Sequence, residues 1–111
     1  MSKMTLREVC NLVGVTRRAV QGYEKAGLVE CSGKNKYGYL LYDELAIEKI
    51  KDIKQYQEFG FSVKEIKHLL ETTAEEYVIV MTKKMTEMKL KVQQLEKNIE
   101  RAEIMISEKQ Q

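Results

Sequence analysis

The side chains with the most specific recognition chemistry lie together near the N-terminus. Thr16, Arg17, Arg18 and Gln21 open a segment, residues 16–25, whose pattern predicts a short helix. Arginine can donate two hydrogen bonds to O6 and N7 of guanine, and glutamine can pair in a similar way with adenine. The same side chains can instead hold phosphates. The cluster therefore indicates contact with duplex DNA, through base edges or through the backbone.

A second cluster of cations and phenols follows in residues 33–42. Lys34, Lys36, Tyr37 and Tyr39 lie around Gly38, and the run from residue 39 to residue 42 favours a strand. The pattern predicts a short hairpin, or wing. These side chains could grip phosphates beside the bases that are read, which positions a protein on DNA without specifying sequence.

Two further residues of the first cluster admit more than one interpretation. Gly22 is unusual inside a helix, where glycine costs about 1 kcal/mol relative to alanine. It either permits close approach to the DNA backbone or is merely tolerated. Tyr23 counts among the candidate DNA contacts, but its ring, like that of Tyr42, also suits a core position with the hydroxyl near the surface.

Few residues suit a catalytic, cofactor or metal site. His68 is the sole histidine, Cys10 and Cys31 lack CxxC spacing, and the chain has no phosphate-binding loop. We expect no enzymatic activity, no cofactor and no bound metal. Cys10 suits the core and Cys31 a loop, although a redox or metal-sensing role for the pair stays an alternative.

The net charge of +2 is small but unevenly distributed. Residues 1–42 hold seven Lys and Arg against three Asp and Glu, residues 43–73 hold five against seven, and residues 74–111 hold seven of each. Positive charge therefore coincides with the two clusters, as phosphate contact requires. No apolar run has the length of a signal peptide or of a membrane span, so we expect a cytoplasmic protein with no membrane partner.

Capping signals predict the helices that position these clusters. Thr5 and Glu8 have capping-box spacing for a helix over residues 6–12, Gly14 suits the turn, and Thr16 suits the N-cap of the next helix, which ends before Gly27. Together they form a helix-turn-helix pattern. The two helices share one apolar face, made of Leu6, Val9, Cys10, Val13, Val15, Val20 and Tyr23.

Two more helices are predicted after the wing. Asp43 caps one over residues 44–59, which Gly60 ends, and Ser62 with Glu65 forms a capping box for a shorter one. We expect the buried sides of these helices to contain Leu45, Ile50, Ile53 and Tyr56 in the first, and Val63, Ile66 and Leu70 in the second.

The last helix, which begins with a capping box of Thr73 and Glu76, has the pattern of a coiled coil. Its apolar residues alternate at spacings of three and four, and a rod of about 50 Å cannot bury them against so small a core. A second copy is the expected partner, and folding back onto its own domain is the alternative. The predicted dimerisation residues are Val78, Met81, Met85, Met88, Val92, Leu95, Ile99, Ala102 and Ile106.

Charge favours an antiparallel pair of such helices. Residues 83–91 carry four lysines against Glu87, whereas residues 96–108 carry four glutamates against Lys97 and Arg101. With Val78 at an a position, Lys89 and Glu96 are e residues, which face each other in antiparallel pairs. Each exposed pair contributes only a few tenths of a kcal/mol, so charge biases the orientation without forcing it.

These features occur in the order and at the spacing of the MerR-type transcriptional regulators, which the chain resembles throughout. The runs YEKAGLV, GYLLYDE and IKQYQEFGFSVKEIKHLL carry the resemblance. Residues 5–70 resemble the family's winged DNA-binding domain and residues 75–108 its dimerisation helix. We therefore predict a mainly α fold with two parts: a winged helix-turn-helix domain, residues 1–73, with a short β-hairpin wing, and an antiparallel coiled-coil dimerisation helix, residues 74–111.

The resemblance also implies roles. Thr16 to Tyr23 match the recognition helix and Tyr37 to Tyr42 the wing. The family's homodimers bind inverted repeats between promoter elements and distort the DNA, which makes double-stranded DNA, a second copy and RNA polymerase at the promoter the expected partners. A protein-docking module with a degenerate DNA-binding face and an excisionase-like architectural protein are the alternatives.

The chain departs from the family's pattern in three places. Val20, Gln21, Gly22 and Tyr23 stand where Leu-Arg-Tyr-Tyr is usual, and Leu40 stands where the wing usually has an arginine. The pattern also predicts no effector domain after the coiled coil and no metal-binding cysteine near that end.

Overall fold

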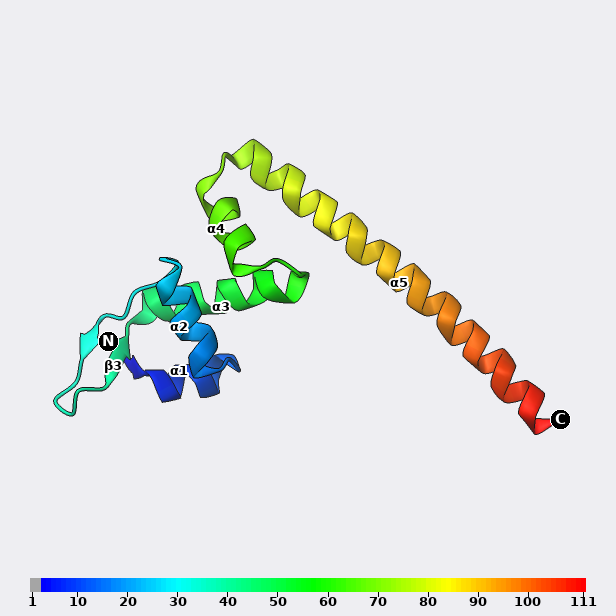
Figure 1. Ribbon diagram of the computed structural model, residues 1–111, viewed down its shortest axis with the longest axis horizontal. Coiled ribbons are helices and arrows are strands. Elements are labelled where there is room, and N and C mark those ends of the chain that lie inside the picture. Colours follow the sequence, from blue (N-terminus) through cyan, green and yellow to red (C-terminus); the bar gives the residue numbers. More distant parts are fainter. Residues whose placement is uncertain (1–2) are drawn as a thin grey trace. The chain divides into compact units, whose positions relative to one another are not determined.

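The computed structural model describes residues 3–111, and their contacts divide into two units (Figure 1). One extends to Thr72 and holds four helices and three short strands, and the other, Thr73–Gln111, is a long helix. The mainly α fold with a small β wing agrees with the prediction.

The helix-turn-helix consists of α1, Leu6–Val13, and α2, Arg17–Lys25. A complete capping box begins α1: the Thr5 hydroxyl accepts from the Glu8 amide, and the Glu8 carboxylate accepts from the Thr5 amide. Gly14 ends α1 in the left-handed region, at φ +77, where a side chain would be strained. Thr16 caps α2 by accepting a 3.0 Å hydrogen bond from the Ala19 amide.

Two further helices complete this unit: α3, Glu44–Phe59, and α4, Val63–Glu71. The carboxylate of Asp43 caps α3 through the Ala46 amide at 2.9 Å, and Ser62 caps α4 within a capping box with Glu65. Gly60 ends α3 at φ +107. The predicted caps therefore define both helices.

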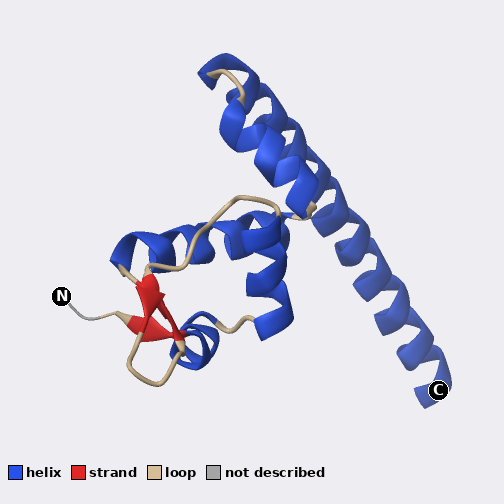
Figure 2. Ribbon diagram, turned by 60° about the vertical axis from the view of Figure 1, so that its left-hand side comes forward, coloured by secondary structure: helices blue, strands red, loops and turns tan. Residues whose placement is uncertain are grey.

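A three-stranded antiparallel sheet lies at the edge of this unit (Figure 2). Its strands are β1, Met4–Thr5, β2, Gly33–Lys34, and β3, Leu40–Tyr42, in the order β1-β3-β2. The hairpin of β2 and β3 is the predicted wing. No sequence pattern predicts β1, which is only two residues long and sets Met4 opposite Tyr42.

The core joins α1, α2, α3, α4 and the sheet. Two leucines predicted to be buried are not: Leu45 is 66% exposed and Leu70 is 52% exposed, whereas Leu69 is buried instead. One residue along a helix is a rotation of about 100°, so α3 turns Ala46 inward in place of Leu45, and α4 turns Leu69 inward in place of Leu70. The buried residues are Val9, Val20, Tyr23, Val29, Tyr42, Ala46, Ile47, Ile50, Ile53, Phe61, Ile66 and Leu69.

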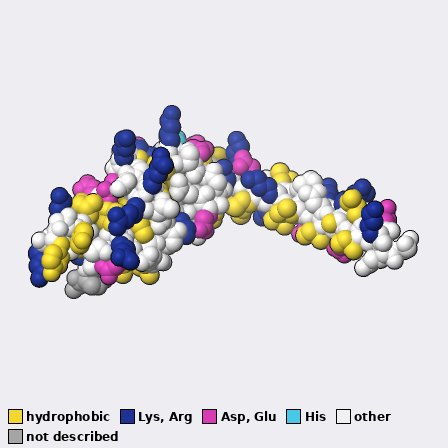
Figure 3. Space-filling view, turned by 60° about the horizontal axis from the view of Figure 1, so that its bottom comes forward, with side chains coloured by type: hydrophobic (Ala, Val, Ile, Leu, Met, Phe, Trp, Pro, Cys, Tyr) yellow, Lys and Arg dark blue, Asp and Glu magenta, His cyan; other side chains and the backbone are white. Residues whose placement is uncertain are grey.

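The second unit is a single unbroken helix, α5, Ala74–Gln110, capped by Thr73. None of its side chains is buried in the single chain, and Val92, Leu95 and Ile99 are all more than half exposed. Figure 3 shows hydrophobic side chains, in yellow, along this helix. Across the described residues, no helix combines the length and apolar character needed to span a bilayer.

Candidate nucleic-acid interface

The outer face of α2 gathers the predicted base-reading residues. Arg17, Arg18, Gln21 and Gly22 are all exposed, and successive rotations of about 100° place them within an arc of roughly 140°. Val20 and Tyr23, which are buried, face the opposite way. Lys25 falls within the same exposed arc and adds a cation that the sequence reasoning had passed over. Thr16, the N-cap, is exposed at the start of this face.

Tyr23 is not part of that face, which corrects its place among the candidate DNA contacts. Its side chain is 1% exposed, and its hydroxyl donates a 2.6 Å hydrogen bond to Oε1 of Gln57 on α3. Burial raises the pKa of this phenol. Tyr23 therefore holds α2 against α3, the core role that the sequence had left open.

A second buried phenol fixes α2 from the side of the sheet. The hydroxyl of Tyr42, on β3, donates a hydrogen bond to the carboxylate of Glu24 on α2. Burial, followed by the bonded Glu24 carboxylate, raises the pKa of Tyr42 well above its usual range. Because Tyr23 and Tyr42 hold two points of α2, its outer face has a fixed direction relative to the wing.

Lys54 of α3 secures the turn between α1 and α2. Its ammonium donates to the carbonyl oxygens of Val13 and Gly14 at 2.8 and 3.0 Å, and Glu58 lies 3.8 Å away. Carbonyls at the end of a helix lack an amide partner within the helix, and they attract a cation. This contact fixes the angle at which α2 leaves the turn.

The wing tip is organised by one asparagine. Oδ1 of Asn35 accepts from the amides of Tyr37 and Tyr39 at 2.9 and 3.1 Å, and its carbonyl accepts from Gly38. Both phenols are consequently held outward, at 71% and 63% exposure. Lys36 Nζ lies 5.2 Å from the centre of the Tyr37 ring. Lys34, also exposed, completes the predicted set.

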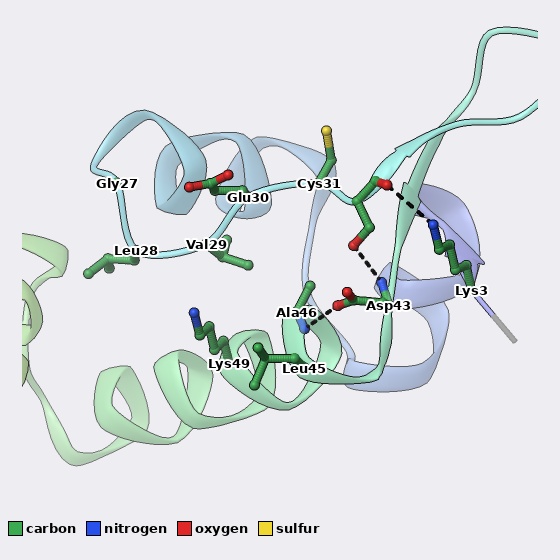
Figure 4. Close-up of a pocket in the computed structure, with 11 residues that line it drawn as sticks. Lys3, Gly27, Leu28, Val29, Glu30, Cys31, Asp43, Leu45, Ala46 and Lys49 are labelled. Atoms are coloured by element: carbon green, nitrogen blue, oxygen red, sulfur yellow. Dashed lines mark hydrogen bonds between the residues drawn. The ribbon is translucent and has the colours of Figure 1, made fainter. Parts of the chain in front are cut away.

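The base of the wing is tied to α3 around a hollow of about 390 Å³ (Figure 4). The Ser32 hydroxyl accepts from the Asp43 amide at 2.9 Å, and the Ser32 carbonyl accepts from Lys3 Nζ at 3.3 Å. The hydrogen bond from Ala46 to Asp43 continues this chain of contacts into α3. The wing is thus anchored at its base as well as ordered at its tip.

The two cysteines are free thiols, and each is half-buried. Burial raises the pKa of Cys10, against the opposing effect of the Arg17 charge. Within residues 3–111, no three side chains among His, Cys, Asp and Glu come together in a group that could hold a metal ion.

A second hollow, of about 410 Å³, lies where α1, α2 and the wing meet. Arg7 and Arg17 line it together with Tyr39 and Leu40. Arg7 is not among the predicted site residues, since it precedes the turn of the helix-turn-helix and belongs to no motif. Only the fold places it at the same hollow as Arg17.

Comparison with known proteins points to one family. The family described as MerR HTH family regulatory protein matches residues 4–73. The nodulation protein NolA of Bradyrhizobium elkanii is 34% identical over 80 residues, which cover 66% of this chain and 36% of the relative. The mercuric resistance operon regulatory protein of Bacillus cereus is 31% identical over 68 residues, 61% of this chain and 52% of the relative. The chain thus spans about a third to a half of these curated relatives.

Solved structures support the fold over almost the whole chain. HiNmlR, a MerR family regulator lacking the sensor domain that was solved bound to promoter DNA, aligns with a TM-score of 0.75 at 19% identity, over 96% of this chain and 89% of that one. The N-terminal part of the Bacillus subtilis multidrug transporter activator aligns with a TM-score of 0.59 at 24% identity, over 87% and 98%.

Proposed function

Because this chain belongs to the MerR HTH family of regulatory proteins, we propose that it is a sequence-specific DNA-binding transcription regulator that acts as a homodimer on an inverted-repeat operator. The observation that carries the proposal is the outer face of α2. Arg17, Arg18 and Gln21 are exposed there, while buried contacts fix the inner face. A rigid helix with exposed donors near its N-terminus is what entry into the major groove requires.

The two clusters take different parts of the contact. Arg18 and Gln21 reach base edges, where Arg18 suits guanine and Gln21 suits adenine. In the wing, Lys34, Lys36, Tyr37 and Tyr39 contact flanking phosphates, since their side chains are exposed on an ordered turn. The wing contacts set register and affinity, and α2 sets sequence preference.

The homodimer rests on α5. Its nine seam residues, Val78 to Ile106, have no buried member in the single chain, and their spacing is that of a coiled coil. A second α5 in antiparallel orientation covers this stripe and sets the basic half of one helix against the acidic half of the other. Two-fold symmetry then presents two copies of α2 to the two halves of an inverted repeat.

Promoter action follows from this arrangement. Two α2 helices that bind successive grooves at a spacing fixed by α5 favour bent or untwisted DNA between the two half-sites. Changed spacing of promoter elements is the means by which such a dimer would act on RNA polymerase. A reducing cytoplasm is the proposed setting, in keeping with two free thiols.

Binding measurements on native promoter DNA test the function. Genome-wide mapping of bound sites supplies the operator, and Arg18→Ala is compared with wild type on it. Loss of a bidentate base contact costs about 1–3 kcal/mol, roughly ten- to a hundredfold in affinity, and relaxes sequence preference at one position of each half-site. Lys64→Ala is the control, because Lys64 is an exposed cation on α4 and belongs to neither cluster.

Two results would overturn the proposal. If Arg18→Ala kept full affinity and selectivity, α2 would not be the reading element. If no duplex bound the wild type tightly at physiological salt while a protein partner did, the docking alternative would replace DNA binding.

A further inference from the structure

Arg7 and Arg17 are brought together by the fold, from helices that are separated in sequence by the turn. Both line the hollow of about 410 Å³ that is closed on the wing side by Gly38, Tyr39 and Leu40. The pairing of β1 with β3 explains why Arg7 lies near the wing, because α1 begins directly after β1 and so starts beside the wing (Figure 1).

This hollow concentrates positive charge without a counter-charge. Among residues 3–111, no Asp or Glu lines it, and the other lining residues are Thr5, Leu6 and the wing residues. Over residues 3–111, neither guanidinium forms an ion pair or a hydrogen bond. The carboxylate of Glu8, the acid next to Arg7, accepts a hydrogen bond from the Thr5 amide in the capping box. Two unneutralised guanidiniums at one hollow attract an anion.

We propose that Arg7 and Arg17 together hold one backbone phosphate of the operator in each half-site, with the Tyr39 hydroxyl beside them. This inference rests on the proposed DNA-binding function and deepens it. The hollow lies between the helix that enters the major groove and the wing, and the DNA backbone has to pass between those two elements. A guanidinium can donate two parallel hydrogen bonds to phosphate oxygens, so two arginines can satisfy one phosphate fully.

The proposal separates the roles of two adjacent arginines. Arg17 lines the hollow, whereas Arg18 does not, because the next residue of α2 is rotated by about 100°. Arg17 is therefore a phosphate ligand, and Arg18 is the base reader. Arg7, the cation from α1, also lines the same hollow as Leu40, the apolar residue of the wing.

The test compares four variants on the mapped operator and on an unrelated duplex, over a range of salt. Arg7→Ala should weaken both complexes by a similar factor and leave the ratio of specific to unspecific affinity unchanged. Each phosphate cation contributes about one unit to the slope of log affinity against log salt, so the slope should fall by about two per dimer. Arg7→Lys keeps the charge and should keep most of the slope. Lys64→Ala should match wild type, and Arg18→Ala should lose selectivity.

A chemical substitution in the DNA identifies the shared phosphate. Neutral methylphosphonates are placed at symmetry-related backbone positions of both half-sites, one pair of positions at a time, because each variant dimer changes both half-sites. At one such pair they should weaken wild-type binding, and on that duplex neither Arg7→Ala nor Arg17→Ala should cause any further loss. Thermal melts of each variant verify that it folds. The exposed Arg7 side chain forms no hydrogen bond within the described chain, so it does not support the fold in that way.

The possible outcomes distinguish a failure of the phosphate site from a failure of the proposed DNA-binding function. If wild type binds the operator but Arg7→Ala behaves like Lys64→Ala, the phosphate site is wrong and DNA binding stands. If Arg7→Ala and Arg17→Ala cause no further loss of affinity with methylphosphonates at different positions, the two arginines do not share a phosphate and the proposal is overturned. If wild type binds no duplex, both fail together.

Discussion

Gly22 lies on the exposed face of α2 beside the arginines, at a place where the fold itself does not require glycine. A Cβ built there meets no atom within 4 Å, and the residue does not have a positive φ. Glycine in a helix nonetheless costs about 1 kcal/mol relative to alanine. Since no side chain of the described residues needs the space, two explanations stay open: a close approach of the DNA backbone under the proposed function, or a glycine that is merely tolerated.

Gly22→Ala should therefore move stability and binding in opposite directions. We expect the free energy of unfolding to rise by about 0.5–1 kcal/mol, because alanine loses less entropy in a helix. Operator affinity should fall, because the new methyl group stands where the backbone approaches. Urea unfolding and operator titration measure the two effects. A variant that is both more stable and equally tight in binding would show that Gly22 is merely tolerated.

At this scale, residue type alone does not decide which side chain is buried. Leu69 and Leu70 are the same amino acid at neighbouring positions, and only the rotation of α4 against the core buries the first and exposes the second. The sequence of Tyr23 and its neighbours is compatible with a core position and with a DNA contact. The hydrogen bond from Tyr23 to Gln57, which is distant in sequence, places the side chain in the core. Arg7 carried no local signal. Each of these assignments depends on contacts between segments far apart in the chain.

Among the elements, the turn of the helix-turn-helix depends on a residue outside it. Lys54 of α3 donates to the carbonyls of Val13 and Gly14. Lys54→Met keeps the aliphatic stem and removes the ammonium, which leaves those carbonyls without a protein donor. We expect a loss of about 1–2 kcal/mol in the free energy of unfolding, and weaker operator binding, because α2 loses its fixed exit from the turn.

Lys51→Met is the matched control for that change. Lys51 also lies on α3, and among the described residues its ammonium contacts only Glu48, at 3.3 Å on the surface. Exposed pairs of this kind contribute between about 0 and 1 kcal/mol. Urea midpoints at one fixed protomer concentration compare the variants. Equal destabilisation by both substitutions would contradict the role of Lys54 at the turn.

The N-cap of α3 predicts a dependence of stability on acid. The Ala46 amide, with a smaller contribution from the Ser32 hydroxyl, lowers the pKa of Asp43 below its ordinary value. Stabilisation by such a group is complete above its unfolded pKa of about 3.9 and is lost as the pH falls through the lower, folded value. Asp43→Asn keeps a capping oxygen but does not titrate.

The two proteins should therefore differ in melting temperature at pH 7, with wild type higher, and should converge as the pH falls through the lowered pKa of Asp43. Thermal melts over this range provide the measurement. Asp52→Asn, which alters an exposed side chain on α3 that caps no helix, is the control. A difference from wild type that stayed constant with pH would exclude Asp43 ionisation as its source.

Element boundaries were the most predictable part of the fold. Thr5, Thr16, Asp43, Ser62 and Thr73 are all N-caps in the structure, as their spacing had predicted, because a cap is a contact within four residues. The strand β1 escaped prediction, since two residues have no periodicity and its pairing partner, β3, lies more than 30 residues away. Local chemistry sets the helices, and long-range pairing sets the sheet.

For the whole molecule, the proposed dimer would determine how DNA is read. One copy of α2 presents few base contacts, whereas two copies at a fixed spacing recognise an inverted repeat as a unit. In the proposed dimer, the exposed seam of α5 would supply the attraction between copies, and its charged flanks would favour one orientation. Orientation matters for function because a parallel pair and an antiparallel pair place the two winged domains at different separations.

Lys89→Glu distinguishes the two orientations by the sign of its effect. With Val78 at an a position, e faces e of the partner in an antiparallel pair, which sets Lys89 against Glu96 twice by symmetry. In a parallel pair, e faces g, which sets Lys89 against Lys84. The new carboxylate is therefore repelled in the first arrangement and attracted in the second.

We expect the dissociation constant of the Lys89→Glu dimer, measured by sedimentation equilibrium, to rise several-fold, because two pairs worth about 0.2–1 kcal/mol each change from attraction to repulsion. Adding Glu96→Lys should restore it, since the exchange of charges recreates both pairs. Lys97→Glu, at an outer f position, makes the same charge change away from the seam and should have little effect. A tighter Lys89→Glu dimer would establish the parallel arrangement, and with it a different spacing of the two recognition helices on DNA.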